Sequence, residues 1–370
     1  MPPFPYAHAA ADDWRDALSM VIDRLGLGRG TLGFVYVTDV VNPHLDDVLD
    51  SLREATAIEH WVGAVGMGIS ATGVEYYERP AIAVMLADFP EHAFRVFPTM
   101  IKDLDGFDQA QSAWLGSLQP YLGLVHADPA NPLTESLVKQ LAARTSTGFL
   151  VGGLASANDN ARVVADGVTE GGISGVMFTE EVGVQTSLSQ GCSPIGPHRT
   201  MTEVQRNILV TLDGRPALDV FKEDIGEILA RDMSRVGGYI FAGLPILGTD
   251  TGDYLVRNLI GVDMDQKLLA IGDLVEQGQQ LMFCRRDADT AREDLSRMLS
   301  RMRSRLSGPP RGGVYVSCLG RGINLFGDES EELKQIRDEL GDFPLVGFYA
   351  NGEISQDRLY GYTGVLTLFT

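Results

Sequence analysis

Two short stretches near the end of the chain carry the residues best suited to bind a charged ligand. The run Cys318-Leu319-Gly320-Arg321-Gly322 holds a thiol and a guanidinium, and Asn351-Gly352-Glu353 holds a lone carboxylate. A guanidinium binds a carboxylate through two parallel hydrogen bonds, and a carboxylate accepts hydrogen bonds from an ammonium group. Arg321 and Glu353 therefore have the chemistry to hold the two ends of a small amino acid.

The elements around these stretches predict that they lie at one edge of a sheet. An apolar strand beginning at Gly313 precedes Arg321, a helix is expected at 329–340, and strands at 343–350 and 359–369 enclose a short loop with Glu353. In α/β sheets, the loops that follow parallel neighbouring strands converge on a crevice that commonly binds ligands. We therefore expect Arg321 and Glu353 to face each other there.

Glycines and one aromatic residue complete the predicted site. Glycines let a backbone approach a ligand closely, and Tyr349 shares its strand face with Gly347 and Asn351. The predicted ligand-binding residues are Cys318, Arg321, Gly322, Gly347, Tyr349, Asn351 and Glu353. Two alternatives stay open. Arg321 and Glu353 would pair with each other or with solvent, or Asn351-Gly352 would be only a turn.

Other kinds of chemistry have less support in the sequence. The six histidines and three cysteines show no HxxH, HExxH or CxxC spacing, and neither a phosphate-binding loop nor a strand-linked GxGxxG is present. We expect no metal and no cofactor. One enzymatic alternative remains, a thiol-dependent hydrolase or transferase, because Cys192 precedes His198 by six residues and Cys318 lies near Arg321.

One strand, loop, helix and strand pattern occurs three times. The first copy has a strand at 32–37, a helix at 44–56 and a strand from Trp61. The second copy has a strand at 121–125, a helix at 133–144 and a strand at 150–152. The spacing from Asp39 to Asn42 is the same as the spacing from Asp128 to Asn131. A looser third copy has 313–316, 329–340 and 345–347. Returning strands at 81–86, 175–178 and 364–369 are expected to run antiparallel. This pattern predicts an α/β fold, with two α/β regions of mixed sheets built from internally repeated units.

Between the second and third copies lies a different kind of region. A strand with an Asp-Gly turn is expected at 211–217, helices at 218–233 and 289–306, and strands at 255–262 and 268–271. In the second helix, Leu295, Met298, Leu299, Met302 and Leu306 share one face. A chain of 370 residues favours two domains, and we place the break near residues 212–217.

Composition narrows the class of protein. The formal net charge of −20 argues against nucleic acid and anionic membrane surfaces as partners. Three widely spaced cysteines favour a reducing compartment, and neither a signal peptide nor an apolar stretch of membrane-spanning length is evident. The sequence predicts a cytoplasmic protein.

Several runs, in order along the chain, resemble the FIST-domain family: Gly152-Gly153-Leu154-Ala155-Ser156, Gly191-Cys192-Ser193-Pro194, Leu212-Asp213-Gly214-Arg215-Pro216, Arg257-Asn258-Leu259, Cys318-Leu319-Gly320-Arg321-Gly322 and Gly352-Glu353-Ile354. The resemblance implies a FIST N-terminal domain at 31–215 after a helical lead-in at 1–30, and a FIST C-terminal domain at 216–370. It also implies an intracellular sensory, signal-transducing module that binds a small ligand, with an amino acid as the usual suggestion. No signalling output is visible, so such a sensor is expected to act through a signalling protein partner. A protein-interaction scaffold is the remaining alternative.

Overall fold

The computed structural model describes residues 2–117, 119–230, 236–246 and 254–370. The chain forms two compact units: the first comprises the chain up to Ser189 together with Asp294–Thr370, and the second is Gln190–Glu293. The division expected near residues 212–217 does not coincide with these units. The reason is that the third predicted copy packs with the first two, while the intervening segment forms a core of its own.

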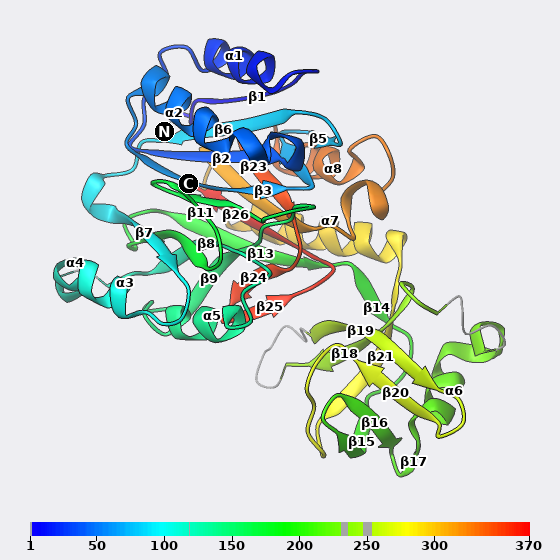
Figure 1. Ribbon diagram of the computed structural model, residues 1–370. Helices are drawn as coiled ribbons and strands as arrows, with labels where there is room; N and C mark the ends of the chain where they lie inside the picture. The colour runs from blue at the N-terminus through cyan, green and yellow to red at the C-terminus, as the bar shows by residue number, and fades with distance from the viewer. Residues whose placement is uncertain (1, 118, 231–235, 247–253) are drawn as a thin grey trace. The chain divides into compact units, whose positions relative to one another are not determined.

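The first unit contains three repeats of the same elements (Figure 1). Repeat 1 is β2 (Leu32–Thr38), η1 (Asp39–His44), α2 (Leu45–Thr56), β3 (His60–Gly66), a hairpin of β4 (Gly68–Ala71) and β5 (Val74–Tyr77), and β6 (Ala81–Ala87). Repeat 2 is β8 (Leu122–Ala127), α5 (Thr134–Ala142), β9 (Phe149–Leu154), β10 (Val163–Ala165), β11 (Val168–Thr169) and β12 (Ile173–Phe178). Repeat 3 is β22 (Gly312–Cys318), η4 (Gly322–Asn324), α8 (Glu331–Leu340), β23 (Leu345–Ala350), β24 (Glu353–Gln356), β25 (Arg358–Tyr360) and β26 (Thr363–Phe369).

Each repeat forms the centre of one mixed six-stranded sheet. The orders are β1-β6-β2-β3-β10-β11, β7-β12-β8-β9-β24-β25 and β13-β26-β22-β23-β4-β5, where the edge strands are β1 (Tyr6–Ala10), β7 (Phe94–Met100) and β13 (Val184–Gln190). In each sheet the two strands around the helix are parallel, and the returning strand is antiparallel to the first of them. The predicted α/β fold with mixed sheets and internal repeats is confirmed.

The repeats exchange their hairpins. The hairpin of repeat 1 pairs with β23 of repeat 3, that of repeat 2 with β3 of repeat 1, and that of repeat 3 with β9 of repeat 2. Every sheet is therefore completed by a hairpin from another repeat, which makes the three repeats one folding unit.

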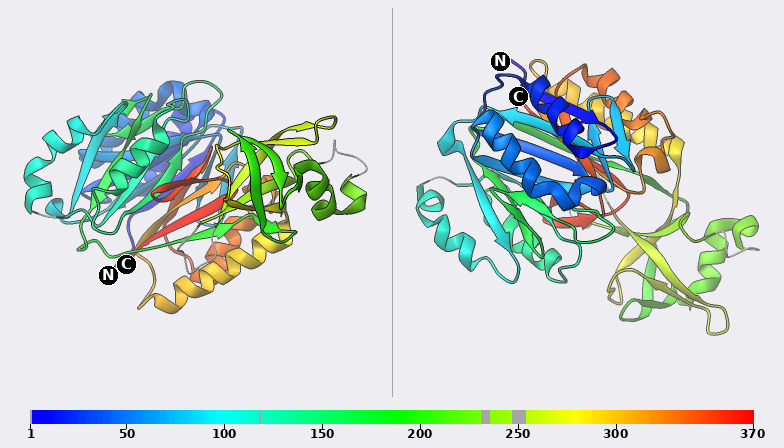
Figure 2. Two further views of the ribbon diagram at one scale, coloured as in Figure 1. Left: turned by 90° about the horizontal axis from the view of Figure 1, so that it is seen from below. Right: turned by 45° about the horizontal axis from the view of Figure 1, so that its top comes forward.

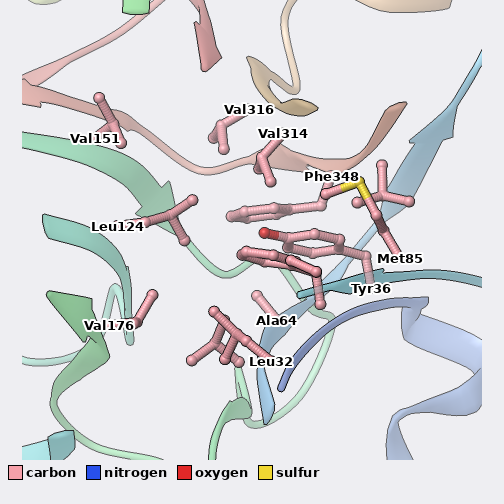
Figure 3. Close-up of a cluster of buried hydrophobic side chains, with 14 of the residues drawn as sticks. Leu32, Tyr36, Ala64, Met85, Leu124, Val151, Val176, Val314, Val316 and Phe348 are labelled. Carbon is pink, nitrogen blue, oxygen red and sulfur yellow. The ribbon is translucent and has the colours of Figure 1, made fainter. Parts of the chain in front are cut away.

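The inner faces of the three sheets share one apolar core. Side chains from all three sheets point toward one another, with the rings of Tyr36 and Phe348 stacked near the centre (Figure 3). The outer faces are covered by helices: α1 (Trp14–Leu25) and α2, in blue in Figure 2, pack on the first sheet, and α5 packs on the second. The predicted helical lead-in thus contains the strand β1 as well as α1, because alternate residues of β1 are buried against β6.

Short helices and a long one complete the first unit. They are η2 (Glu91–Ala93), α3 (Asp105–Ala110), α4 (Ser112–Ser117) and α7 (Ala288–Arg305), which begins in the second unit. Leu295, Met298, Leu299 and Met302 of α7 are buried, as their spacing predicts.

In the part of the second unit that the structure describes, an antiparallel sheet packs against a helix. Its elements are β14 (Cys192–Pro194), β15 (Arg199–Gln205), β16 (Ile208–Leu212), β17 (Arg215–Pro216), α6 (Ala217–Ala230), β18 (Ile240–Pro245), β19 (Tyr254–Asp263), β20 (Leu268–Ile271) and β21 (Gln280–Arg286). All pairings described in it are antiparallel, so the mixed sheets belong to the first unit. The end of the helix predicted at 218–233 lies outside the described residues.

Within the described part of the chain, every helix is too short or too polar to cross a lipid bilayer.

Candidate functional site

The predicted site lies where β22 and β23 end. The two strands are parallel neighbours, Cys318 pairs with Ala350, and the Leu319 N–H donates to the Ala350 carbonyl at 3.0 Å. Side chains at this edge divide between two faces of the sheet. Val314 and Val316 point into the central core, so Cys318 continues that inner face, whereas Tyr315 and Ser317 point toward α8.

Glu353 lies on the inner side and is fully buried. It is the first residue of β24, paired with Gly153 of the second sheet, rather than part of a loop as the sequence suggested. One carboxylate oxygen, Oε2, accepts hydrogen bonds from the Thr363 N–H at 3.0 Å and the Thr363 hydroxyl at 2.7 Å. The other, Oε1, has no hydrogen-bond partner within the described residues. Burial raises the pKa of Glu353 to about 8, although the bonds from Thr363 oppose this.

Cys318 is the neighbour of Glu353 and is only partly buried. Its Sγ accepts a weak hydrogen bond from the Gly320 N–H at 3.4 Å. Burial, followed by the charge of Glu353, raises the pKa of the Cys318 thiol. The thiol is therefore protonated at neutral pH, because these effects outweigh the opposing effect of the Arg321 charge on its pKa.

Arg321 lies under α8 and pairs with Glu332, which the sequence did not single out. Both side chains are fully buried, with Arg321 Nε 2.7 Å from Glu332 Oε1. Arg321 therefore pairs with Glu332, and not with Glu353 or solvent, the two partners that the sequence left open. Among the described residues, the terminal nitrogens Nη1 and Nη2 make long contacts, at 3.5 and 3.4 Å, to the carbonyl and hydroxyl of Ser189, and the guanidinium carbon lies 5.0 Å from the centroid of the Phe326 ring.

Glu332 organises a polar network beneath α8. Its carboxylate accepts hydrogen bonds from the Tyr315 hydroxyl at 2.6 Å, from the Ser317 hydroxyl at 3.2 and 3.3 Å, and from the Gly322 N–H at 2.9 Å. The sequence signal for this role was weak, because Glu332 is one of five acidic residues between positions 329 and 340.

The remaining predicted residues are scattered. Tyr349 is fully buried on the α8 side, with its ring centroid 5.0 Å from that of Tyr77. Gly347 sits in mid-strand, where a Cβ atom would lie 1.8 Å from the Tyr315 carbonyl oxygen, so the close strand approach requires glycine there. Asn351 is exposed. The structure thus joins Cys318 with Glu353, joins Arg321 with Gly322 and Tyr349 on the other face, and separates Gly347 and Asn351 from both groups.

Glu75 and Tyr77, from the hairpin of repeat 1, extend the network under α8. Burial, followed by the nearby charge of Glu332, raises the pKa of Glu75 to about 7. The hydroxyls of Tyr77 and Tyr349 lie close enough to Glu75 to oppose that rise, though neither forms a hydrogen bond of ordinary length. Glu75 and Tyr349 are 274 positions apart in the sequence and are brought together only by hairpin exchange, so no local pattern could have revealed this cluster.

His126 is a further buried polar group on the inner side. His126 on β8 and Glu353 on β24 both pair with Gly153 of β9, one from each side. The Nε2 of His126 lies 3.1 Å from the Tyr36 hydroxyl, and its Nδ1 has no partner among the described residues. Burial lowers the pKa of His126 to about 3, so the imidazole is neutral.

Comparison of the three repeats shows apolar residues at the positions equivalent to Ser317, Tyr349 and Glu353. Cross-strand pairs at the same register are Val37–Val65 in repeat 1, Ala127–Leu154 in repeat 2 and Ser317–Tyr349 in repeat 3. The hairpin residue that pairs with the second parallel strand at the equivalent position is Ile69 from repeat 1, Val163 from repeat 2 and Glu353 from repeat 3. An apolar residue therefore occupies the position equivalent to Glu353 in the other two repeats, so packing alone does not call for a carboxylate there.

The family models identify the chain, and two uncharacterised mycobacterial proteins are similar to it over most of its length. The FIST N domain model matches residues 31–215 and the FIST C domain model matches residues 217–356. An uncharacterised protein of Mycobacterium tuberculosis strain H37Rv is 31% identical over 349 residues, covering 88% of this chain and 88% of that protein. An uncharacterised protein of Mycobacterium bovis is 28% identical over 342 residues, covering 87% of this chain and 86% of that protein. FIST domains are generally sensory domains of signal transduction proteins. The chain belongs to the FIST family, as a FIST N domain followed by a FIST C domain.

Proposed function

We propose that this protein is a sensor whose ligand is a small amine or amino acid bound at Glu353. The observation that carries the proposal is a fully buried carboxylate whose Oε1 has no hydrogen-bond partner among the described residues, at a position where the other two repeats have Ile69 and Val163. An ionised carboxylate in such surroundings is costly unless a cation neutralises it. A ligand ammonium would do so.

Arg321, which lies beyond the end of β22 on the α8 side, is proposed to take the acidic end of a zwitterionic ligand that passes the end of that strand. Among the described residues, its Nη1 and Nη2 donors make long contacts, while Nε holds Glu332. The charge of Arg321 also acts on Glu353, so the two groups lie within electrostatic range of each other. Glu332 would keep the guanidinium oriented while its other edge binds the ligand.

The route to Glu353 in this proposal passes Cys318. Cys318, Gly320 and Tyr362 are partly exposed, whereas Arg321 and Glu353 are fully enclosed. Ligand entry therefore requires the segment 319–324 to move, and that movement is a means of transmitting the binding event to a signalling partner.

A thermal-shift screen of amino acids and small amines tests the function. A ligand at a hundredfold excess over its dissociation constant stabilises the native state by about 2.7 kcal/mol, which raises the melting temperature by a few degrees. Glu353→Gln should abolish the shift, and Glu331→Gln, an exposed glutamate of α8, should keep it. A hit that survives in Glu353→Gln would place the ligand elsewhere. A protein partner in pull-downs with no hit at all would favour the scaffold alternative.

Proton release gives a second measurement. Because the pKa of Glu353 is about 8, the carboxyl is protonated in most molecules at pH 7 and must ionise to bind an ammonium. Calorimetric titration in two buffers with different ionisation enthalpies should show protons leaving on binding. Equal heats in both buffers would contradict the role of Glu353.

A further inference from the structure

A cavity lies at the opposite end of the repeat strands from Glu353. It has a volume of ≈ 240 Å³ and opens beside Leu122 and Phe149, the first residues of β8 and β9. Glu353, by contrast, pairs with Gly153 near the last residue of β9. β13 and the end of α7 form the remaining walls. This cavity is separate from the site proposed above.

The charge of the cavity favours an anionic ligand. Arg305 is the one charged side chain lining it, and no lining residue is acidic, although the chain carries 50 aspartates and glutamates. Arg305 has no ion-pair partner among the residues described, and it is exposed. A guanidinium with no competing carboxylate is suited to a ligand carboxylate.

The body of the cavity favours a planar apolar ligand. The half-buried rings of Tyr121 and Phe149 line it together with Met302 and Val184. Aromatic side chains stack on planar ligands, and thioether sulfur makes favourable contacts with rings. A cavity of about 150 Å³ holds benzene, so a volume of ≈ 240 Å³ admits one ring with small substituents.

Gln185 adds a requirement for a hydrogen-bond donor. Its Nε2 donates to the backbone carbonyl of Arg305 at 3.0 Å, which determines the orientation of the amide. The buried Oε1 then has no partner among the described residues. A buried acceptor without a donor is destabilising, and a ligand hydroxyl or N–H would satisfy it.

We propose that this cavity, bounded by Tyr121, Phe149, Gln185 and Arg305, is a second ligand site for a small aromatic carboxylic acid bearing a hydroxyl or N–H group. Such a site makes the protein responsive to two chemically different ligands. The site requires neither Glu353 nor Arg321, so its test does not depend on the function proposed above.

Titration with 4-hydroxybenzoate, followed by calorimetry or ligand-observed NMR, tests the site. Loss of one charge-assisted contact should weaken binding about tenfold in Arg305→Gln. Arg303→Gln, an exposed arginine of the same helix outside the lining, is the matched control and should bind normally. Glu353→Gln should also bind normally. Gln185→Leu should bind benzoate and 4-hydroxybenzoate equally, whereas the unchanged protein prefers 4-hydroxybenzoate.

Two results would overturn the proposal. One is the absence of binding to the unchanged protein at millimolar concentration of 4-hydroxybenzoate. The other is equal affinity in Arg305→Gln, or equal affinity for the neutral analogue 4-hydroxybenzyl alcohol, because either shows that the guanidinium does not recognise the carboxylate.

Discussion

At the scale of single residues, the protein is unusual in burying ionisable groups without complete pairing. Glu353 has one free carboxylate oxygen, and His126 has one free ring nitrogen among the described residues. Burial moves the pKa values of both toward the neutral form, to about 8 for Glu353 and about 3 for His126. Each shift makes folding stability depend on pH, with opposite sign.

The stability of the unliganded protein should fall as the pH rises toward 8. Between pH 4.5 and about 8, Glu353 is protonated in the folded protein but ionised in the unfolded chain, so unfolding releases a proton. Glu353→Gln should remove this loss, as measured by urea unfolding between pH 6.5 and 9. His126 does not interfere there, because its proton uptake on unfolding occurs between about pH 3 and 6.5.

Glu75→Gln provides the comparison for that experiment. The pKa of Glu75 is raised only to about 7, so this variant should flatten the curve up to pH 7 and leave the loss between pH 7 and 8. An unchanged slope in Glu353→Gln would show that this carboxylate is already ionised in the folded protein.

The thiol of Cys318 should react slowly. Its pKa is raised by burial and by Glu353, the pKa of Cys284 is raised by burial to about 12, and Cys192 is buried. At pH 7.5, iodoacetamide should therefore modify all three cysteines more slowly than free cysteine, as followed by mass spectrometry. A fast-reacting Cys318 or Cys192, lost together with some turnover, would instead support a thiol-dependent enzyme.

At the scale of elements, α8 differs from its counterparts in how it contacts its sheet. The helices α2 and α5 cover apolar faces that include Val37 and Ala127, respectively. Beneath α8 the same register carries Ser317, and the helix contributes Glu332. The apolar residues Leu333 and Ile336 of α8 are also buried, and Glu332 forms the ion pair with Arg321, so the contact of α8 with its sheet is part polar and part apolar.

Breaking the buried ion pair should be costly. Glu332→Gln keeps an acceptor for Tyr315 but leaves the Arg321 guanidinium buried without a counter-charge, a loss of about 3–5 kcal/mol. The double variant Arg321→Met with Glu332→Gln should recover part of that loss, because it removes the uncompensated charge. Urea unfolding measures both. Additive losses would show that the two side chains do not interact energetically.

At the scale of the whole molecule, the first unit depends on contacts between repeats rather than within them. Hairpin exchange makes each sheet from two repeats, and the N-terminal segment adds a further connection. Phe4 is buried between the ends of the first and third sheets, with its ring centroid 5.4 Å from Phe89 and 6.1 Å from Phe369. A loss at one such contact is expected to weaken all three repeats together.

Phe4→Ala tests this dependence. Removing a fully packed phenylalanine should cost about 3–5 kcal/mol. Leu27→Ala, at a side chain that is 99% exposed, should change the stability by less than about 0.5 kcal/mol. Unfolding by urea, observed through tryptophan fluorescence and circular dichroism, should remain a single transition for the first unit. Separate transitions would indicate that the repeats fold independently.

Much of this protein is determined by its sequence alone, because the signals are local. The period of apolar residues identified the strands and helices, and the identical spacing from Asp39 and from Asp128 revealed the first two repeats. The returning strands and the mixed sheets followed from that pattern. At the candidate site, Cys318, Arg321 and Glu353 could be identified as candidate binding residues because reactive or charged side chains directly follow apolar strands in the sequence.

Only the tertiary structure decided how those groups are arranged. It paired Arg321 with Glu332, brought Glu75 from a distant repeat to Tyr349, and made Glu353 part of a strand of the second sheet. It also placed the third repeat in one unit with the first two, although the segment 190–293 separates them in the sequence. The order of elements along the chain had suggested a single division near residue 215. The physical reason is that hairpin exchange and salt-bridge choice depend on side chains distant in sequence. Their burial energies are set by the packed core and not by neighbours along the chain.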